Sequence, residues 1–457
     1  MPTDRTCRHS VPPGPEAWAL AISAVRILLA ALFTLLAAAA CTRPVPEQAA
    51  TSSPSPAPPK DALPLEAAAA RLADLAFGRL DLPPGTHRAL VIDPLIDRAT
   101  GQETNATRSF AAELETVIRA RYPAIEIRPF TLATLDEKPL ILLGAITPVT
   151  APGSLTNASG TSGTYRLWAA LGDLRTGRIL AKPMVWIRAE TVDPTPVLFF
   201  RDSPVWTPDP VIAAYLRTCA GTPGAEMDPT YLHALRAQAA VAEAITAYED
   251  GRYAAALDLY QTAAEAPGGE QQRVLNGLYL TNWALGRRQA AEEAFARVVD
   301  FGLAQDRLAV KLLFRPGTTE FVRDLGVSGP YSMWLRQIAD RAEHRGACLR
   351  ITGHASVTGA TATNDRLSLA RAERVRARLI AQQPPLRERC RAEGRGSREP
   401  IVGTGTDDMR DALDRRVEFA PLPCADLTAN GVTPLSSRLA GSALRRTDLA
   451  RSPSPGA

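Results

Sequence analysis

The residues of this chain best suited to bind a ligand lie in three short segments of its last third. The segments are GHAS at 353–356, NDRLSLARA at 364–372 and DRRV at 414–417. In a helix, positions 364, 367, 368 and 371 fall on one face, because they are three or four residues apart. The guanidinium of Arg371 on that face is a group that binds a carboxylate through two parallel hydrogen bonds. These residue types indicate recognition of a charged group.

Motifs for catalysis, cofactors and metals are missing from the sequence. It has no P-loop, HExxH or GxSxG motif, and its GRG and GTG triplets lack the strand and helix of a nucleotide site. No CxxC pair suggests zinc. His354 reads as a structural strand residue. Asp93 and Asp97 sit at a predicted strand end and could suggest a hydrolase, but a turn or capping role fits better without a histidine or nucleophile motif. We predict no enzyme activity, no cofactor and no metal.

The elements that must position the three segments alternate between strands and helices. Predicted strands cover 308–314, 348–353, 391–396 and 415–419, and predicted helices cover 331–345, 364–381 and 407–413. Asn364 is a suitable N-cap for the second helix, and Arg371 should project from it toward the end of the strand that contains Gly353. The alternating order predicts a mixed sheet covered by helices over 306–424.

These motifs resemble those of the OmpA-like peptidoglycan-binding domain of the OmpA, Pal and MotB type. That family shows G-H-T-D, then N-x-x-L-S-x-x-R-A, then N-R-R-V, and the likeness covers about 120 residues here. The resemblance implies a βαβαβ domain that binds the diaminopimelate side chain of the peptidoglycan stem peptide. It assigns the ligand carboxylate to Arg371, and the residues that would shape the pocket are Ser356, Asn364, Leu367 and Arg415.

Two positions depart from the family pattern. Ser356 replaces the family aspartate that holds the ligand ammonium, and Asp414 replaces an asparagine. A charged hydrogen bond contributes about 1.5–3 kcal/mol and a neutral one about 0.5–1.5, so losing the carboxylate weakens binding about tenfold. Asp365 or Asp414 could supply the missing charge. The alternative is a domain that keeps the fold but has lost or changed its ligand.

The amino terminus predicts export. Residues 1–40 contain early arginines, a 14-residue apolar run at 27–40 and small residues before Cys41, as in a signal peptide of the lipoprotein type. We expect lipidation of Cys41, with ordinary cleavage nearby as the alternative. Thr42, rather than aspartate, implies the outer membrane by the lipoprotein sorting rule. Residues 41–63 then form a lipidated cysteine followed by a Pro-, Ser- and Ala-rich stalk.

Four cysteines remain after the signal and Cys41 are set aside. They are Cys219, Cys348, Cys390 and Cys424, and an oxidising compartment would allow three full pairings among them. Cys348 opens a predicted strand and Cys424 follows the last one. This placement favours a Cys348–Cys424 disulfide, with free thiols as the alternative.

Two further domains are predicted before the OmpA-like one. Residues 64–225 contain the order helix, strand, helix and four strands, with a hairpin turn at 174–177, which predicts a sheet with helices on one face. This order resembles the small α/β domain of periplasmic lipoproteins from flagellar and curli-secretion systems. Residues 230–305 contain Gly251, Ala256 and Tyr260, whose counterparts Gly286, Ala291 and Phe295 follow 35 residues later. That period resembles a pair of tetratricopeptide (TPR) repeats, acting as a peptide-binding groove or as a rigid spacer.

The composition fits this organisation. A length of 457 residues suggests about three domains, and 46% hydrophobic with 22% charged residues is ordinary for globular proteins. A net charge of +4 gives no strong field for nucleic acid, and only four of the 52 basic residues are lysine, which suggests a GC-rich genome. Residues 425–457 read as a disordered tail.

The predicted fold class is α+β multidomain, with an N-terminal α/β domain, a short TPR-like helical region and a C-terminal OmpA-like domain. We expect a non-catalytic outer-membrane lipoprotein, lipid-anchored and facing the periplasm, that binds peptidoglycan and tethers the envelope. The expected partners are peptidoglycan, the outer membrane and a protein at the TPR-like region. The alternative is a periplasmic scaffold for a secretion or wall-synthesis partner.

Overall fold

The computed structural model describes residues 62–80, 83, 85–149, 163–315, 317–324, 328–401 and 413–427. The expected signal peptide, Cys41, nearly all of the stalk, most of the helix expected at 407–413 and nearly all of the tail lie outside these ranges. Within the described ranges, no helix is both long enough and apolar enough to cross a bilayer.

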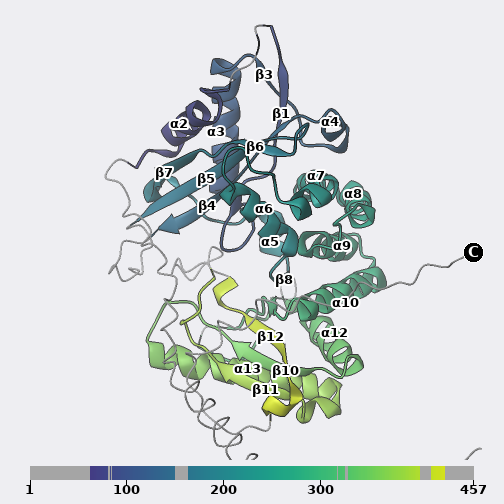
Figure 1. The fold of residues 1–457 in the computed structure, drawn as a ribbon. Helices are drawn as coiled ribbons and strands as arrows, with labels where there is room; N and C mark the ends of the chain where they lie inside the picture. The colour runs from purple at the N-terminus through teal and green to yellow at the C-terminus, as the bar shows by residue number, and fades with distance from the viewer. Residues whose placement is uncertain are drawn as a thin grey trace, which may run out of the picture. The chain divides into compact units, whose positions relative to one another are not determined.

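A seven-stranded sheet organises the first part of the described chain (Figure 1). Its strands are β1 (Arg88–Ile92), β2 (Ile96–Asp97), β3 (Ile125–Ile127), β4 (Leu140–Val149), β5 (Thr164–Asp173), β6 (Arg178–Ala181) and β7 (Met184–Arg188). The order is β3-β1-β4-β5-β6, with β2 on β4 and β7 on β5. β3, β1 and β4 are parallel, whereas β4, β5 and β6 are antiparallel. The strand expected at 178–187 is divided at Pro183, which has no N–H to donate.

Helices cover both faces of this sheet, so the prediction of helices on one face was wrong. The helices α2 (Leu65–Phe77) and α3 (Asn105–Arg121) pack on Leu90 and Leu142 of one face, while α6 (Pro210–Ala220) and α7 (Pro229–Glu249) pack on Val91 and Ile141 of the other. The physical reason lies in β4, whose residues 140–146 are all buried. A strand that is apolar at successive positions needs apolar cover on both sides.

Helices α7 to α10 contain the 35-residue correspondence found in the sequence. After α7 come α8 (Tyr253–Glu265), α9 (Gln272–Ala284) and α10 (Arg288–Ala304). Gly251 and Gly286 precede α8 and α10 with φ of 73° and 72°, a conformation that glycine adopts without steric cost. The corresponding pairs Ala256 with Ala291 and Tyr260 with Phe295 are all fully buried.

A five-stranded sheet with the order β11-β10-β12-β9-β8 forms the last part. Its elements are β8 (Val205–Trp206), β9 (Leu308–Val310), α12 (Tyr331–His344), β10 (Cys348–Gly353), α13 (Thr361–Gln382), β11 (Cys390–Gly394) and β12 (Val417–Leu422). The sheet is mixed, because β10 and β11 are parallel and the other pairs antiparallel. Strand β8 comes from within 64–225, so the range expected for the first domain contributes to this second sheet.

The remaining elements are short. They are α4 (Leu132–Asp136), α5 (Leu198–Asp202) and 3-10 turns at Ala189–Thr191, Pro384–Arg387 and Cys424–Leu427. One apolar cluster runs through α8, α9, α10, α12, α13 and the strands β9, β10 and β12. Cys348 and Cys424 form a disulfide, the pairing that their strand positions favoured, and Cys219 and Cys390 are buried thiols.

Candidate functional site

The residue Asn364 joins the start of α13 to the loop before it. The helix begins at Thr361 with Ala360 at the N-cap, so the prediction of Asn364 as N-cap was wrong. Instead, its side-chain amide donates to the carbonyl oxygens of Ser356 at 3.2 Å and Thr358 at 2.8 Å. The reason is that α13 starts about one turn before the motif, at Thr361. Asn364 therefore lies within the first turns of the helix and not at its N-terminal cap.

Gly353 and Ser368 allow α13 to pack closely against the ends of β10 and β11. A Cβ on Gly353 would overlap the carbonyl oxygen of Ser368, so α13 lies directly against the end of β10. The hydroxyl of Ser368 donates to the carbonyl of Asp365 at 3.0 Å and accepts from the backbone N–H of Gly396 at 2.9 Å. These contacts fix α13 on the ends of the two parallel strands β10 and β11.

Arg371 lies on the same buried face of α13, as its spacing predicted. Its side chain is 6% exposed. Its Nε donates to the carbonyl oxygen of Thr318 at 3.1 Å, and its guanidinium carbon lies 4.8 Å from the centre of the Phe314 ring. Both contacts come from the segment that follows β9, which ends at Val310 rather than at Phe314 as predicted, and neither residue was predicted to belong to the site. They fix the plane of the guanidinium.

The other predicted site residues differ in burial and in partners. Ser356 is buried, with its hydroxyl 2.9 Å from that of Thr358. Asp414 is fully buried and accepts a 2.6 Å hydrogen bond from the backbone N–H of Ile401. Leu367 and Arg415 are half-buried. The structure thus links Ser356 to Asn364 and gives Asp414 a role in holding residue 401.

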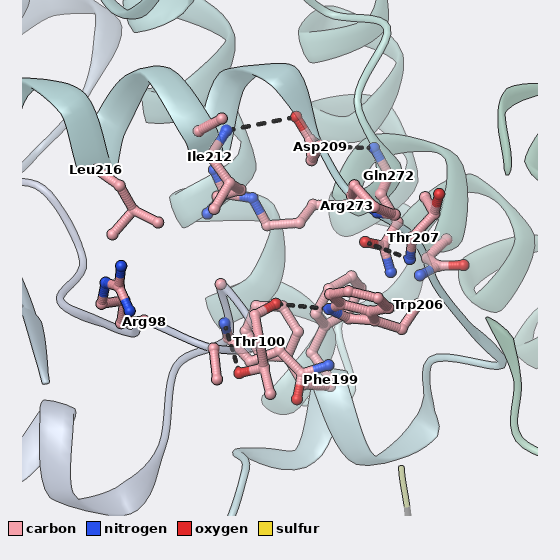
Figure 2. Close-up of a pocket in the computed structure, with 17 residues that line it drawn as sticks. Arg98, Thr100, Phe199, Trp206, Thr207, Asp209, Ile212, Leu216, Gln272 and Arg273 are labelled. Atoms are coloured by element: carbon pink, nitrogen blue, oxygen red, sulfur yellow. Dashed lines mark hydrogen bonds between the residues drawn. The ribbon is translucent and has the colours of Figure 1, made fainter. Parts of the chain in front are cut away.

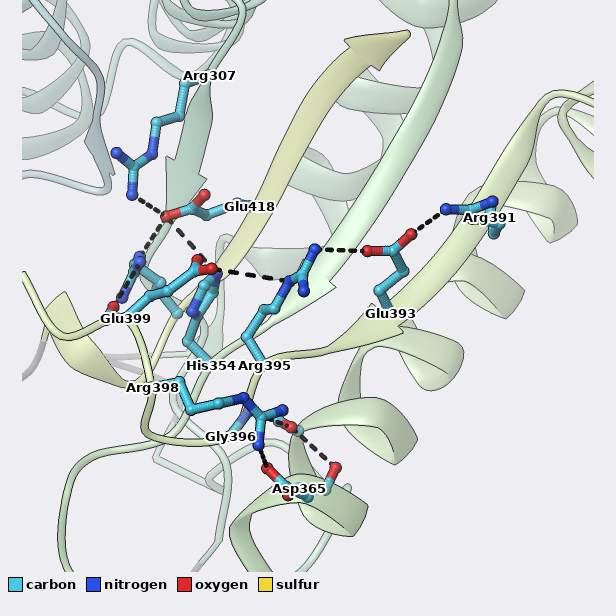
Figure 3. A network of polar contacts seen from close by, with 12 residues as sticks. Arg307, His354, Asp365, Arg391, Glu393, Arg395, Gly396, Arg398, Glu399 and Glu418 are labelled. Carbon is cyan, nitrogen blue, oxygen red and sulfur yellow. Dashed lines mark hydrogen bonds and ion pairs between the residues drawn. The ribbon is translucent and has the colours of Figure 1, made fainter. Parts of the chain in front are cut away.

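Behind the motif lies a buried network of charges (Figure 3). One oxygen of Glu418 accepts hydrogen bonds from Arg416 Nε and Arg307 Nη2, both at 2.6 Å, and lies 3.7 Å from His354 Nε2. Burial alone would raise the pKa of Glu418, but its interactions with His354, Arg307 and Arg416 hold that pKa well below its usual range. Burial lowers the pKa of His354. This arrangement agrees with a structural role for His354.

A second set of ion pairs lies beside this network and involves β11, the residues that follow it and the first turns of α13. Arg395 contacts Glu393 at 3.2 Å, and Arg398 contacts Asp365 at 2.5 Å (Figure 3). The carboxylate of Asp365 therefore already has a cationic partner. Of the two acids suggested as replacements for the family aspartate, Asp365 is in an ion pair and Asp414 is bonded to a backbone amide.

Asp93 and Asp97, the residues considered for a hydrolase, have separate structural partners. Asp97 Oδ1 accepts from the backbone N–H groups of Ala99 at 3.0 Å and Thr100 at 2.9 Å, which is the turn role expected. Asp93 is buried and accepts a 2.6 Å hydrogen bond from the Tyr231 hydroxyl of α7. Among the residues that the structure describes, no group of three His, Cys, Asp or Glu side chains could hold a metal ion.

Asp93 makes stability depend on pH. Burial raises its pKa from 3.8 to about 7, against the lowering effects of Tyr231 and Arg273. The folded protein therefore binds a proton that the unfolded chain releases, and stability falls as pH rises from about 4 to 7. Between pH 5 and pH 8 the free energy of unfolding of the wild type should therefore decrease, and Asp93→Asn should make that decrease smaller by about 2–3 kcal/mol. Urea unfolding at pH 5 and at pH 8 measures the two free energies.

The exposed Asp136 provides the control for this measurement, since it pairs with Arg236 on the surface. Asp136→Asn should leave the pH dependence of the free energy of unfolding as in the wild type. An Asp93→Asn variant with the wild-type pH dependence would contradict the assignment.

Comparison with known families identifies the part of the chain that contains α12, β10, α13 and β11. The OmpA family profile matches residues 330–413. These residues form an OmpA family domain. Ser356, Asn364, Leu367 and Arg371 lie within the match, whereas Asp414 and Arg415 follow it directly. The elements β8, β9 and β12 and the Arg307–Glu418 pair lie outside it.

Solved structures similar to the OmpA domain come from several bacteria. The peptidoglycan-associated lipoprotein from Burkholderia pseudomallei is 22% identical, with 26% of this chain and 93% of that chain covered and a TM-score of 0.21. The cell wall anchor of the type VI secretion system (T6SS) from Pseudomonas aeruginosa is 28% identical, with 26% and 82% covered and a TM-score of 0.21. The periplasmic domain of Helicobacter pylori MotB is 21% identical, with 26% and 74% covered and a TM-score of 0.21. No curated protein matches the chain.

Proposed function

We propose that the OmpA domain binds peptidoglycan noncovalently, with Arg371 holding the carboxylate of the diaminopimelate side chain. The observation that carries this proposal is the fixed guanidinium of Arg371, which is 6% exposed and held by Thr318. An arginine fixed in this way can offer two parallel N–H groups to a carboxylate. The peptidoglycan-associated lipoprotein and the cell wall anchor among the similar structures support the same function.

Sedimentation with purified sacculi tests this function. The wild-type protein should co-sediment with sacculi and remain soluble without them. Soluble wild-type protein in both samples would favour the second function, a periplasmic interaction scaffold whose OmpA domain no longer binds peptidoglycan. The serine at position 356, where the family has aspartate, is the observation that favours this alternative.

We infer that Asp414 supplies the negative charge for the ligand ammonium. Asp414→Asn keeps one oxygen as an acceptor for the Ile401 amide, 2.6 Å away in the wild type, while it removes the negative charge and replaces the second oxygen with an NH2 group. Because a charged hydrogen bond exceeds a neutral one by about 1–1.5 kcal/mol, the dissociation constant for sacculi should rise about tenfold. Quantitative co-sedimentation measures this constant.

Asp365→Asn separates the two candidate acids. If it weakens sacculus binding about tenfold while Asp414→Asn does not, the anion is Asp365 and the assignment of Asp414 is wrong. The exposed Asp250, which pairs with Arg252 in the helical region, provides a matched control. Asp250→Asn should bind sacculi like the wild type.

We propose a lipid at Cys41 as the outer-membrane anchor, followed by the stalk as a spacer toward the wall. The support is the apolar run at 27–40 followed by cysteine and threonine. Cells that express the protein should incorporate labelled palmitate into it, and Cys41→Ser should abolish the label. Labelling of the Cys41→Ser variant would contradict the anchor.

The helices α7 to α10 have a proposed supporting role as a TPR-like repeat pair. The support for a repeat is that residues at equivalent positions of the two units are buried alike, Ala256 with Ala291 and Tyr260 with Phe295. A pair of units is fewer than TPR arrays need for independent stability. We therefore assign them a spacer role beside the two sheets, with a protein partner on their surface as the alternative. Pull-down with the Arg371→Ala protein would reveal such a partner independently of peptidoglycan.

A further inference from the structure

A cavity of about 180 Å³ lies away from the peptidoglycan site, where the loop after β2, the segment around β8 and the helices α6 and α9 meet. Figure 2 shows the side chains that line it. Its volume slightly exceeds that of an apolar cavity of about 150 Å³ that holds a benzene ring. It can therefore contain a ring-sized group together with a few further atoms.

One wall of this cavity is apolar and rigid. It is formed by the side chains of Phe199, Phe200, Trp206, Ile212 and Leu216. The indole Nε1 of Trp206 donates to the carbonyl oxygen of Thr100 at 2.8 Å, which fixes the orientation of the ring (Figure 2). Such a wall suits the apolar body of a ligand.

Two buried polar side chains in the cavity have unused hydrogen-bonding atoms. Arg273 is 7% exposed and Asn276 is 1% exposed. Within the described part of the chain, neither Arg273 Nε nor Asn276 Oδ1 has a hydrogen-bond partner. Arg273 extends from α9 past Asp209 toward Ile212 (Figure 2). A buried donor on a charged group gains most from an acceptor that also carries charge.

The acids near Arg273 are bonded elsewhere. Asp209 accepts from the backbone N–H groups of Val211 at 2.8 Å and Gln272 at 2.9 Å. Glu103 pairs with Arg108 at 3.1 Å, and Asp93 bonds to the Tyr231 hydroxyl. These contacts leave the Nε–H of Arg273 for a further acceptor.

Arg98 adds a second positive charge to the lining. It is exposed, its side chain has no hydrogen bond or ion pair to any residue in the described ranges, and its charge acts on the adjacent carboxylate of Asp97. The lining thus has two arginines and one carboxylate, Asp209. Its charge favours an anionic ligand.

We propose that this cavity binds a small organic carboxylate with a ring-sized apolar body. The carboxylate would accept from Arg273 Nε and lie near Arg98, and the body would pack on Trp206 and Phe199. Two sources share this chemistry, a free aromatic acid and the C-terminal carboxylate of a peptide that ends in an apolar residue. The site is independent of peptidoglycan binding.

Calorimetric titration of the full protein with phenylacetate tests the charge and the size together. We expect a dissociation constant of about a millimolar or lower, because a ligand of about ten non-hydrogen atoms can gain the binding free energy that this affinity requires. The uncharged phenylacetamide should bind at least about tenfold more weakly. Equal affinities for the acid and the amide, or no binding of either, would overturn the proposal. The dipeptide Ala-Phe and its amide form the second arm, and the tighter carboxylate identifies the source.

Two surface variants locate the ligand without disturbing the buried groups. Arg98→Ala should weaken phenylacetate binding about tenfold, and Ala213→Phe should abolish it, because the exposed Ala213 lines the cavity. Arg71→Ala on α2 removes an exposed arginine that does not line the cavity and serves as the control. Phenylacetate binding that survives both Arg98→Ala and Ala213→Phe unchanged would overturn the assignment of this cavity.

Discussion

The Glu418→Ala variant is expected to lose about 3–5 kcal/mol of its free energy of unfolding. Glu418 is the carboxylate that Arg416 and Arg307 both contact at 2.6 Å, and Arg416 is 1% exposed. Removal of the carboxylate leaves the Arg416 guanidinium buried without its anion. Urea unfolding at pH 7, followed by tryptophan fluorescence, measures the loss.

The contribution of the Glu418 carboxylate to the free energy of unfolding depends on pH. Because the folded pKa lies below the ordinary 4.5, the contribution of Glu418 is fully present above about pH 5 and falls as pH decreases further. The exposed Glu320, which pairs with Arg315 at 2.9 Å, is the control. Glu320→Ala should cost less than about 1 kcal/mol, and a similarly small cost for Glu418→Ala would refute the network's role.

The Arg371→Ala variant is expected to bind sacculi about 100-fold more weakly than the wild type. Truncation of one partner of a buried charged pair costs at least about 2–5 kcal/mol, and 100-fold corresponds to about 2.7 kcal/mol. Arg371→Lys keeps the charge but loses the paired N–H groups, so its loss should be intermediate. Quantitative co-sedimentation of the three proteins measures both effects.

Two controls separate binding from folding for Arg371. Arg374 is an exposed arginine on the same helix, and Arg374→Ala should sediment like the wild type. Thermal unfolding of each variant shows whether loss of the Thr318 contact has destabilised the domain. A folded Arg371→Ala protein that binds sacculi as the wild type does would exclude Arg371 from the site.

Local patterns predicted two elements of the OmpA domain closely, whereas the strand expected at 308–314 ends at Val310 and the strand expected at 415–419 runs from Val417 to Leu422. The strand expected at 348–353 has the same bounds as β10, and the helix expected at 331–345 ends one residue earlier, at His344. The start of α13 was missed because Asn364 was assigned as a cap from its residue type. Strand β8 was also missed, since two residues carry no periodic signal and their partner β9 lies about 100 residues later.

The motif spacing located one face of α13 but not the groups that contact it. Asn364, Ser368 and Arg371 are all buried on that face. Phe314 and Thr318, which fix the arginine, come from a segment about 50 residues earlier that has no motif. The Arg307–Glu418 pair is likewise invisible to spacing, because only the fold brings β9 and β12 together. Contacts between distant segments are set by sheet order.

The position of β8 determines where the OmpA domain can be cut from the chain. Strand β8 lies at one end of the five-stranded sheet and pairs with β9. A fragment of residues 306–424 lacks β8 and leaves the N–H and C=O groups on one side of β9 unpaired. Exposed strand edges of this kind pair with other copies and aggregate. The fragment would also expose the apolar residues of β9, including Ala309, which packs on Trp206 in the intact chain. A soluble recombinant fragment therefore needs to begin before Val205.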